Sequence, residues 1–258
     1  MRRYGMLALV LAMGCKHAPP PDSAPLRVAA AADLSEAFTE VGATFEKETG
    51  RKVTFTFGAT GLLAKQIEEG APYDLFAAAN LSFVDDAIAS GACDGSTKAI
   101  YGEGRIVLWS RGDAGVVANV LADLTRPDIV HVSIANPDHA PYGKAAKQAL
   151  ERSGVWDAVS TKVVYGENVQ QAFQFAQSGN AEVAIIALSL ATVSGGHTAP
   201  IEPSLHDPLK QGIVVCKGAP GTNNQDDAKK FEALVMSAEG RGIMRRYGFL
   251  PGEAASVH

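Results

Sequence analysis

The chain has 258 residues and a net charge of −5, with 47% hydrophobic and 20% charged residues. These values are ordinary for a globular protein and argue against a disordered chain, a coiled coil or a collagen-like chain. The length allows one large domain or two small ones, each with a buried core. Lysine and arginine form no cluster after the first residues, so we expect no nucleic acid partner. The three cysteines, Cys15, Cys93 and Cys216, have no CxxC spacing, which argues against a zinc framework.

The first fifteen residues have the pattern of an export signal. Two arginines precede the apolar run MLALVLAM, and a glycine stands directly before Cys15. The run is much shorter than the roughly 20 residues that cross a bilayer, so we predict a signal peptide over 1–15 and an extracytoplasmic mature chain. The Gly-Cys pair resembles a lipobox and predicts a lipid anchor on Cys15, although an ordinary signal peptide with an incidental cysteine is the alternative. Residues 16–25, KHAPPPDSAP, are then a proline-rich tether.

Export also bears on the two remaining cysteines. An oxidising compartment permits a disulfide between Cys93 and Cys216. The sequence gives no distance between them, so two separate buried thiols remain an equal alternative.

From Leu26 onward, strand and helix patterns alternate. The first apolar run is followed by Leu34, Phe38, Val41 and Phe45 at helical spacing, and we expect this helix to end before a glycine at position 50. Alternation of this kind predicts an α/β fold with mainly parallel sheets and helices on both faces. The strands are expected over residues 27–31, 53–57, 74–79, 105–109, 131–135, 162–165, 182–188 and 212–216.

The last predicted helix, over 226–247, is long enough to cross back over an earlier part of the molecule. One domain is then discontinuous in sequence. We therefore expect two lobes with a cleft between them: lobe I from residues 26–104 and 212–258, and lobe II from residues 105–211.

Four predicted strand-to-helix junctions have small or flexible residues where the helix starts. A helix N-terminus has unpaired N–H groups and a partial positive charge, and small residues let an anion approach that backbone. Four such ends that converge would make an oxyanion site, whereas the plain alternative is four tight turns. The junctions are 31–34 (AADL), 58–61 (GATG), 140–143 (APYG) and 166–169 (GENV).

Signatures of catalysis are missing from the sequence. It has no GxSxG, GxxxxGK[ST], HExxH or GxGxxG motif. His131 and His139 flank a predicted strand without an evident carboxylate partner, so we assign them no metal. We predict that the protein is not an enzyme and needs no cofactor.

The segment 28–80, VAAAADLSEAFTEVGATFEKETGRKVTFTFGATGLLAKQIEEGAPYDLFAAAN, resembles the amino-terminal half of periplasmic molybdate-binding proteins of ABC importers. Weaker similarity continues in order through GRIVLW, NPDHAPYG, ENVQQA and RRYGF, so the resemblance covers nearly the whole mature chain. It implies a type II periplasmic-binding-protein fold with a ligand cleft between two lobes. It also implies a monomer that delivers its ligand to a permease and its ATPase.

The resemblance further implies that molybdate or tungstate is held by backbone N–H groups and a few hydroxyls. Molybdenum would be present only as this oxyanion. Thr60 and Tyr142 each have a hydroxyl that can donate one hydrogen bond. In another branch of the family a tyrosine comes from a later strand, but Ala187 stands at that place here. Carried over by position, the contacts come from Ala32, Asp33, Ala59, Thr60, Tyr142 and Val169.

Asp33 departs from the family pattern, because many members have Ser or Asn there. A carboxylate about 4 Å from a dianion costs on the order of 8 kcal/mol at an effective dielectric constant near 20. One interpretation makes Asp33 a helix N-cap, since Asp33 and Glu36 have the spacing of a capping box. The other has Asp33 face the ligand and accept a hydrogen bond from a protonated oxyanion such as phosphate or a phosphonate.

Three functional hypotheses follow from these residues. The first is a solute-binding lipoprotein that captures molybdate or tungstate for an importer. The second keeps the fold and changes the ligand to a protonated oxyanion. The third is an extracytoplasmic sensor or enzyme on the same scaffold, since a fold does not fix a function.

Overall fold

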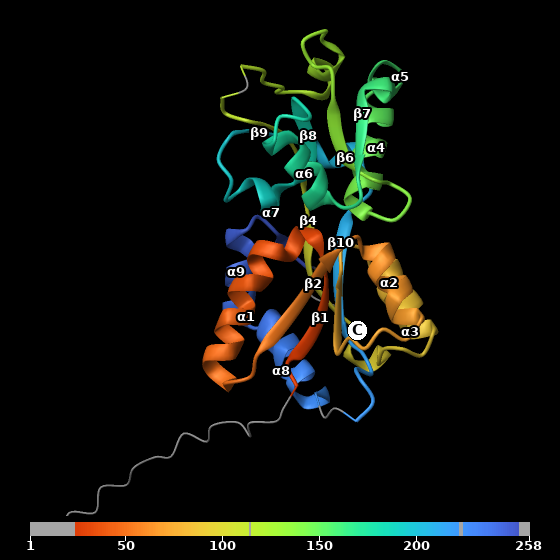
Figure 1. The fold of residues 1–258 in the computed structure, drawn as a ribbon, viewed down its shortest axis with the longest axis vertical. Coiled ribbons are helices and arrows are strands. Elements are labelled where there is room, and N and C mark those ends of the chain that lie inside the picture. Colours follow the sequence, from red (N-terminus) through yellow and green to blue (C-terminus); the bar gives the residue numbers. More distant parts are fainter. Residues whose placement is uncertain (1–23, 114, 222–223, 253–258) are drawn as a thin grey trace, which may run out of the picture.

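The computed structural model describes residues 24–113, 115–221 and 224–252 of the chain. These residues form two lobes, each built on its own sheet and stacked along the long axis of the molecule (Figure 1). The predicted α/β class and two-lobed architecture are confirmed. The predicted signal peptide, Cys15 and the tether as far as residue 23 lie outside the described residues.

The first lobe contains a six-stranded sheet in the order β11-β4-β10-β3-β1-β2. β1 pairs in parallel with β2 and β3, whereas β10 runs antiparallel to β3 and β4, and β11 runs antiparallel to β4. Two distant parts of the sequence therefore share this sheet. Its strands are β1 (Leu26–Ala31), β2 (Val53–Gly58), β3 (Leu75–Ala78), β4 (Ala99–Gly104), β10 (Leu209–Val215) and β11 (Leu250–Pro251).

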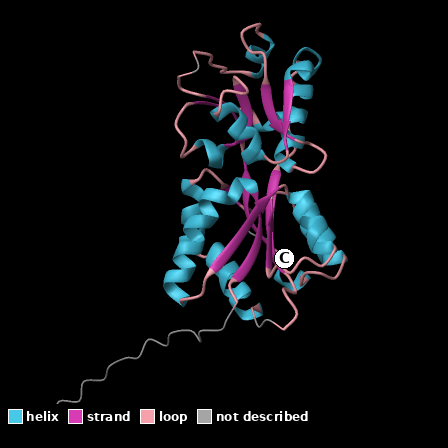
Figure 2. Cartoon of the chain, viewed as in Figure 1, coloured by secondary structure: helices cyan, strands magenta, loops and turns pink. Residues whose placement is uncertain are grey.

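Helices cover both faces of this sheet (Figure 2). Successive strand residues point to opposite faces, and apolar residues on each face pack against the helices there. Phe76 and Val214 pack in one cluster with α2 and α3. The alternate strand residues pack with α1 and α8, where the Phe231 ring lies 5.8 Å from that of Phe38 and 5.4 Å from that of Phe45. The helices are α1 (Ser35–Thr49), α2 (Thr60–Glu68), α3 (Leu81–Ala89), α8 (Gln225–Met236) and α9 (Ala238–Arg246).

Local signals explain where some of these helices stop. α1 ends at Gly50, as predicted. This glycine has a φ of +72°, a left-handed backbone conformation that is less favourable for residues with a side chain. The single long helix predicted over 226–247 is wrong, because α8 and α9 are separate helices. The break falls at Ser237, whose Oγ accepts a 3.1 Å hydrogen bond from the N–H of Gly240 and so starts α9 anew.

The second lobe contains a five-stranded sheet in the order β7-β6-β8-β5-β9. β6 is parallel to β7 and β8, and β5 is antiparallel to β8 and β9. Its strands are β5 (Ile106–Ser110), β6 (Val132–Ala135), β7 (Val163–Gly166), β8 (Val183–Ala187) and β9 (His197–Pro200). Its α-helices are α4 (Pro141–Arg152), α5 (Trp156–Val159), α6 (Val169–Gln177) and α7 (Leu188–Ala191). Five 3-10 turns complete the described chain: η1 (Ala32–Leu34), η2 (Gly95–Thr97), η3 (Leu121–Thr125), η4 (Ser160–Lys162) and η5 (Pro203–Leu205).

The prediction of mainly parallel sheets is wrong, because both sheets are mixed. Strands joined through a crossover helix, such as β1 and β2, are parallel. Apart from the pair of β11 with β4, the antiparallel pairs all involve β5 or β10, the strands by which the chain enters and leaves the second lobe. β4, β9 and β11 were not predicted at all, since short segments with glycine, proline or charge lack the apolar alternation of a strand.

Several contacts join the two lobes besides the covalent connections. The chain passes from β4 to β5 through Arg105 alone. The N–H of Gly61 at the start of α2 donates a 2.9 Å hydrogen bond to the carbonyl of His139 in the second lobe. The hydroxyl of Ser189 in α7 donates a 2.7 Å bond to the carbonyl of Asp33. The lobes are therefore in contact, with the helix starts between them.

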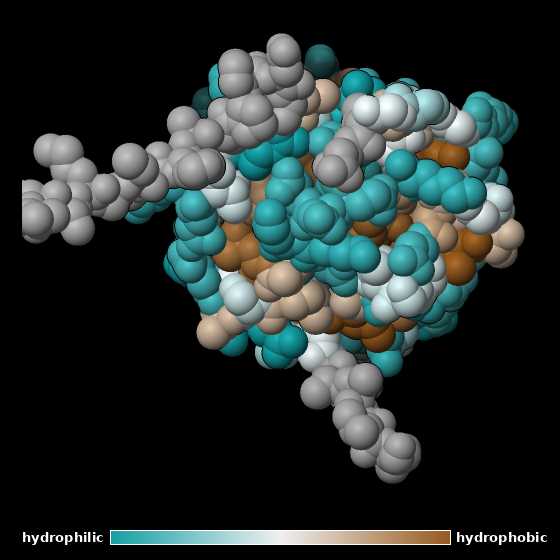
Figure 3. Space-filling view, turned by 90° about the horizontal axis from the view of Figure 1, so that it is seen from below, coloured by the Kyte–Doolittle hydropathy of each residue, from teal (hydrophilic) through white to brown (hydrophobic). Residues whose placement is uncertain are grey.

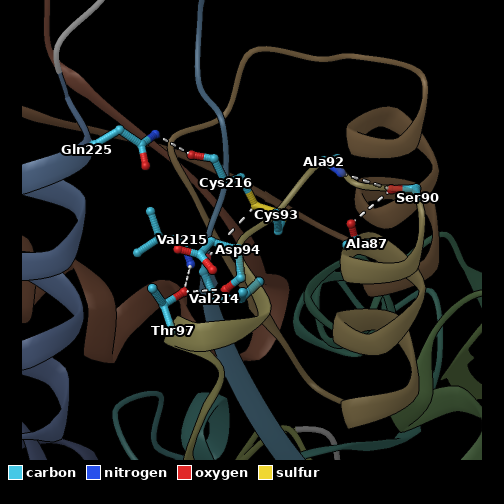
Figure 4. The surroundings of a disulfide bond; sticks show 10 residues. All are labelled: Ala87, Ser90, Ala92, Cys93, Asp94, Thr97, Val214, Val215, Cys216 and Gln225. Carbon is cyan, nitrogen blue, oxygen red and sulfur yellow. Dashed lines mark hydrogen bonds between the residues drawn. A yellow bond between two sulfur atoms is a disulfide. The ribbon is translucent and has the colours of Figure 1, made fainter.

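Cys93 and Cys216 form a disulfide in the first lobe (Figure 4). Cys93 lies beyond α3 and Cys216 directly follows β10, so the bond ties a helix connection to a central strand. Both residues are buried in the cluster that includes α2 and α3. Of the two alternatives for these cysteines, the structure contains the pair.

The surface at the far end of the first lobe is mostly hydrophilic, with hydrophobic residues in small separated patches (Figure 3). In the part of the chain that the structure describes, no helix combines the length and the apolar character needed to cross a bilayer.

Candidate functional site

Four places where a strand leads into a helix meet between the lobes. β1 leads into η1 and α1, β2 into α2, β6 into α4 and β7 into α6. They line a cavity of about 10 Å³, which is room for about one water molecule. All six residues predicted to contact an oxyanion are in this lining. The full set is Ala31, Ala32, Asp33, Gly58, Ala59, Thr60, Ala79, Ala140, Pro141, Tyr142, Asn168 and Val169.

A larger groove of about 470 Å³ adjoins the cavity, because Ala140 and Pro141 line both. Its walls come from both lobes, with Phe83 on one side and Lys144 on the other. The groove marks the side from which a ligand would reach the inner cavity.

Residues at the helix starts line the cavity, so backbone N–H groups lie beside it. In α6 the side chain of Asn168 accepts hydrogen bonds from the N–H groups of Gln170 and Gln171. This cap leaves the N–H of Val169 without a partner among the described residues. The alanines at 32 and 59 have short side chains, so an anion can approach the backbone beside them.

Thr60 is the first residue of α2 and is buried, with 1% of its surface exposed. Its Oγ1 accepts a 3.2 Å hydrogen bond from the N–H of Ala79, at the end of β3. That bond fixes the hydroxyl oxygen and leaves its own proton free to donate into the cavity. Thr60 is thus a buried hydroxyl at the cavity with a proton that can be donated.

Asp33 is the acidic group of the site, and its side chain does not cap a helix. It lies inside η1, α1 begins after Leu34, and no side chain bonds to the start of that helix. The capping interpretation is therefore wrong. The Asp33 side chain is fully buried, and its Oδ2 accepts 2.9 Å hydrogen bonds from the hydroxyl of Tyr142 and from Nε2 of Gln211. Its Oδ1 is buried and has no hydrogen-bond partner.

Burial dominates the acid–base behaviour of this group. It raises the pKa of Asp33 from 3.8 to about 6, because a buried carboxylate loses its hydration and no cation compensates it. The hydrogen bonds from Gln211 and Tyr142, and a smaller contribution from the residue's own backbone, lower this pKa and offset part of the effect. A fraction of the protein therefore carries a protonated Asp33 near neutral pH.

Tyr142 and Gln211 form a buried network around this carboxyl. Gln211 Nε2 also donates a 2.9 Å bond to the Tyr142 hydroxyl, and Gln211 Oε1 accepts a 2.7 Å bond from the hydroxyl of Tyr101. Burial, and then the charge of Asp33, raise the pKa values of both tyrosines well above 10. In this structure the Tyr142 hydroxyl donates its hydrogen bond to Asp33, so it is not free to donate one to a ligand.

Gly104 makes room for this network at the crossing between the lobes. A Cβ at this position would stand 2.1 Å from the Tyr142 hydroxyl and 2.6 Å from Gln211 Nε2. Sequence reasoning missed Gly104, Gln211 and Tyr101. The one signal available was a polar glutamine in an apolar strand segment, and nothing in the sequence linked it to Asp33.

In the described part of the chain, the cavity lining contains no cationic side chain. None of the residues that line the cavity is a lysine, arginine or histidine. Among the described residues no three His, Cys, Asp or Glu side chains are grouped to hold a metal ion. Negative charge in the cavity would therefore be balanced by oriented N–H groups, the Thr60 hydroxyl and any proton on Asp33.

Comparison with known proteins agrees with this geometry. Residues 26–250 match the family model described as bacterial extracellular solute-binding protein. The chain belongs to this family. It is 34% identical over 250 residues to the molybdate-binding protein ModA of Rhodobacter capsulatus, covering 96% of each chain. It is 35% identical over 255 residues to ModA of Azotobacter vinelandii, covering 95% of this chain and 98% of that one.

The solved structures show the same fold. The periplasmic molybdate-binding protein of Azotobacter vinelandii superposes with a TM-score of 0.81 at 27% identity, over 88% of this chain and all of that one. The type II periplasmic-binding-protein fold expected from the sequence is confirmed.

Proposed function

We propose that this protein is the extracytoplasmic solute-binding component of an ABC importer and captures molybdate or tungstate between its lobes. The observation that carries the proposal is the convergence of four helix starts on one cavity lined by Ala32, Asp33, Ala59, Thr60, Tyr142 and Val169. The molybdate-binding relatives, matched over nearly their whole length, support the same ligand. We propose no catalytic role for any of these residues.

Neutral donors suit capture followed by release. Backbone N–H groups and the Thr60 hydroxyl bind an oxyanion strongly once the closed lobes exclude water. No fixed cation holds the anion in place when the lobes separate again. The ligand then leaves as the closure is undone at the permease.

A second candidate ligand is a protonated oxyanion such as phosphate or a phosphonate. The inward Asp33 carboxyl favours it, because Oδ1 is a hydrogen-bond acceptor without a partner. An ionised Asp33 would accept a hydrogen bond from such a ligand and repel an oxyanion that carries no proton. An extracytoplasmic sensor or enzyme on this scaffold is the remaining alternative.

We propose further that the protein acts as a monomer and hands its ligand to a permease and its ATPase. A lipid on Cys15 and the tether over 16–25 would keep it at the membrane surface. We also propose that lobe I comprises residues 26–104 and 212–258 and lobe II residues 105–211. β10 spans the second of these boundaries.

Isothermal titration of the purified protein with molybdate, tungstate, sulfate and phosphate tests the ligand. Tight binding of molybdate and tungstate, with weak or no binding of the other two, supports the importer proposal. Binding of phosphate without molybdate favours the second candidate. Silence with all four anions contradicts both and points to the sensor or enzyme alternative.

A further inference from the structure

We propose that capture of a fully deprotonated oxyanion at this site takes up one proton, which Asp33 holds on Oδ1 and donates to the ligand. The inference rests on the proposed function and adds to it the protonation state in which the site works. Asp33 is then a neutral hydrogen-bond donor in the complex, like the threonine and the backbone N–H groups around it.

The two oxygens of the Asp33 carboxyl have different surroundings. Oδ2 accepts two hydrogen bonds, from Tyr142 and Gln211, and these fix the plane of the carboxyl group. Oδ1 is buried without a partner, and the residue lines the cavity. Buried polar atoms in proteins are nearly always paired, so an orphaned oxygen beside a cavity points to a partner that arrives with the ligand.

A proton must lie between Oδ1 and a bound oxyanion oxygen, because both are hydrogen-bond acceptors when ionised. Hydrogen phosphate would bring that proton with it. Molybdate and sulfate carry none at neutral pH, so with them the proton comes from solvent. In this binding reaction an ionised Asp33, a dianion and one proton from solvent combine. The product is a protonated Asp33 whose Oδ1–H donates a hydrogen bond to the dianion.

No other group at the site competes for this proton near neutral pH. Tyr142 from α4 and Tyr101 from β4 face the carboxyl region, and burial with the charge of Asp33 raises their pKa values well above 10. β2, α6 and α7, which also pack against η1, have no titratable side chains. The charged residues of α1, which follows η1, are partly or fully exposed.

The raised pKa of Asp33 favours this change before a ligand binds. The pKa of Asp33 is about 6, so at pH 7 about one molecule in ten is protonated before the ligand arrives. A dianion next to the carboxyl raises that pKa further. Affinity for molybdate should therefore fall about tenfold for each pH unit above 7 and level off below pH 6, where the empty site is itself protonated.

Calorimetric titration of the protein with sodium molybdate at pH 7, in Pipes and in imidazole, measures the protons taken up, because the two buffers have different ionisation enthalpies. We expect an uptake approaching one proton per molybdate, because most of Asp33 is ionised at this pH before the ligand binds. Titrations between pH 6.5 and 8.5 should show the tenfold change in Kd per unit. No variant is needed for this part of the test.

The matched variant is Asp33→Asn, whose amide keeps the shape and donates from Nδ2 without titrating. It should bind molybdate with no proton uptake and with a Kd independent of pH. Molybdate binding to the unaltered protein without uptake would overturn the inference and leave the proposed function standing. Equal uptake by the variant would also overturn it. If the unaltered protein does not bind molybdate at all, whether or not it binds phosphate, the proposed function on which the inference rests is itself contradicted.

Discussion

The hydroxyl of Tyr142 donates a 2.9 Å hydrogen bond to Oδ2 of Asp33 and so joins α4 of the second lobe to the turn after β1 of the first. Both side chains are buried, and the bond lies at the edge of the cavity. The same carboxyl also accepts from Gln211, in the strand that returns from the second lobe. Asp33 thus links the contact between the lobes to the ligand site.

The first prediction concerns stability and pH. The folded protein has an Asp33 pKa of about 6, against 3.8 for the same group in the unfolded chain, so folding favours the protonated form. This stabilisation is fully present below about pH 4 and is lost as pH rises to 6. Because a two-unit shift corresponds to about 3 kcal/mol, Asp33→Asn should become more stable relative to the unaltered protein by up to that amount between pH 4 and 7.

Urea unfolding of both proteins, without ligand, across this pH range measures the difference. Other carboxyl groups titrate equally in the two proteins and cancel. A constant difference in the free energy of unfolding from pH 4 to 7 would contradict the raised pKa.

The second prediction concerns Thr60. Thr60→Val keeps the shape of the side chain and removes the hydroxyl, so it should weaken oxyanion binding by about 1.5 to 3 kcal/mol, or roughly 10- to 150-fold in Kd. Titration calorimetry measures the change. Thr54→Val is the matched control, because Thr54 is an exposed threonine on β2 and should have no effect. Equal affinities of the Thr60 variant and the control would exclude Thr60 as a contact.

The third prediction concerns closure of the lobes. A Cβ on Gly61 would stand 2.9 Å from the carbonyl oxygen of His139, a backbone atom of the opposite lobe. Gly61→Ala should therefore hinder closure and weaken oxyanion binding about tenfold or more, while the helix itself tolerates alanine. Gly242→Ala in α9 is the control, since its Cβ would meet only the end of Arg246 at 4.0 Å. An unchanged Kd for the Gly61 variant would show that this contact does not limit closure.

The fourth prediction concerns the disulfide. Replacing Cys93 and Cys216 by alanine should lower the free energy of unfolding by about 2 to 5 kcal/mol, because the bond restricts a long loop of the unfolded chain. Oxyanion affinity should stay the same, since Cys216 lies five residues, or about 17 Å, along β10 from Gln211. Chemical unfolding and calorimetry measure the two effects. A large loss of affinity in the folded variant would contradict their independence.

Much of the site was predictable because each part of it is local. A short strand followed by small residues and a helical pattern is visible in AADL, GATG, APYG and GENV, and the structure brings all four segments to one cavity. The family resemblance selected the same positions. Parallel strands end at a common edge of a sheet, which is why the helix starts within one lobe come together.

The partners of Asp33 were not predictable from local pattern. Tyr142 and Gln211 are 109 and 178 residues away, and only the assembled fold brings them to the carboxyl. The D-x-x-E spacing favoured a helix cap, but these tertiary hydrogen bonds hold Asp33 inside η1 instead. The antiparallel direction of β10 was also not predictable from local pattern. This strand joins the first sheet only after the chain has built the second lobe.

Diffraction from crystals grown with molybdate, recorded at the molybdenum absorption edge, tests the proposed ligand site most directly. We expect one strong anomalous peak, from molybdenum, in the cavity between the starts of α1, α2, α4 and α6. The oxygens bound to it should lie within hydrogen-bond distance of Thr60 Oγ1, Asp33 Oδ1 and the N–H of Val169. A peak elsewhere on the molecule, or no peak at a molybdate concentration well above the measured Kd, would contradict the site proposed here.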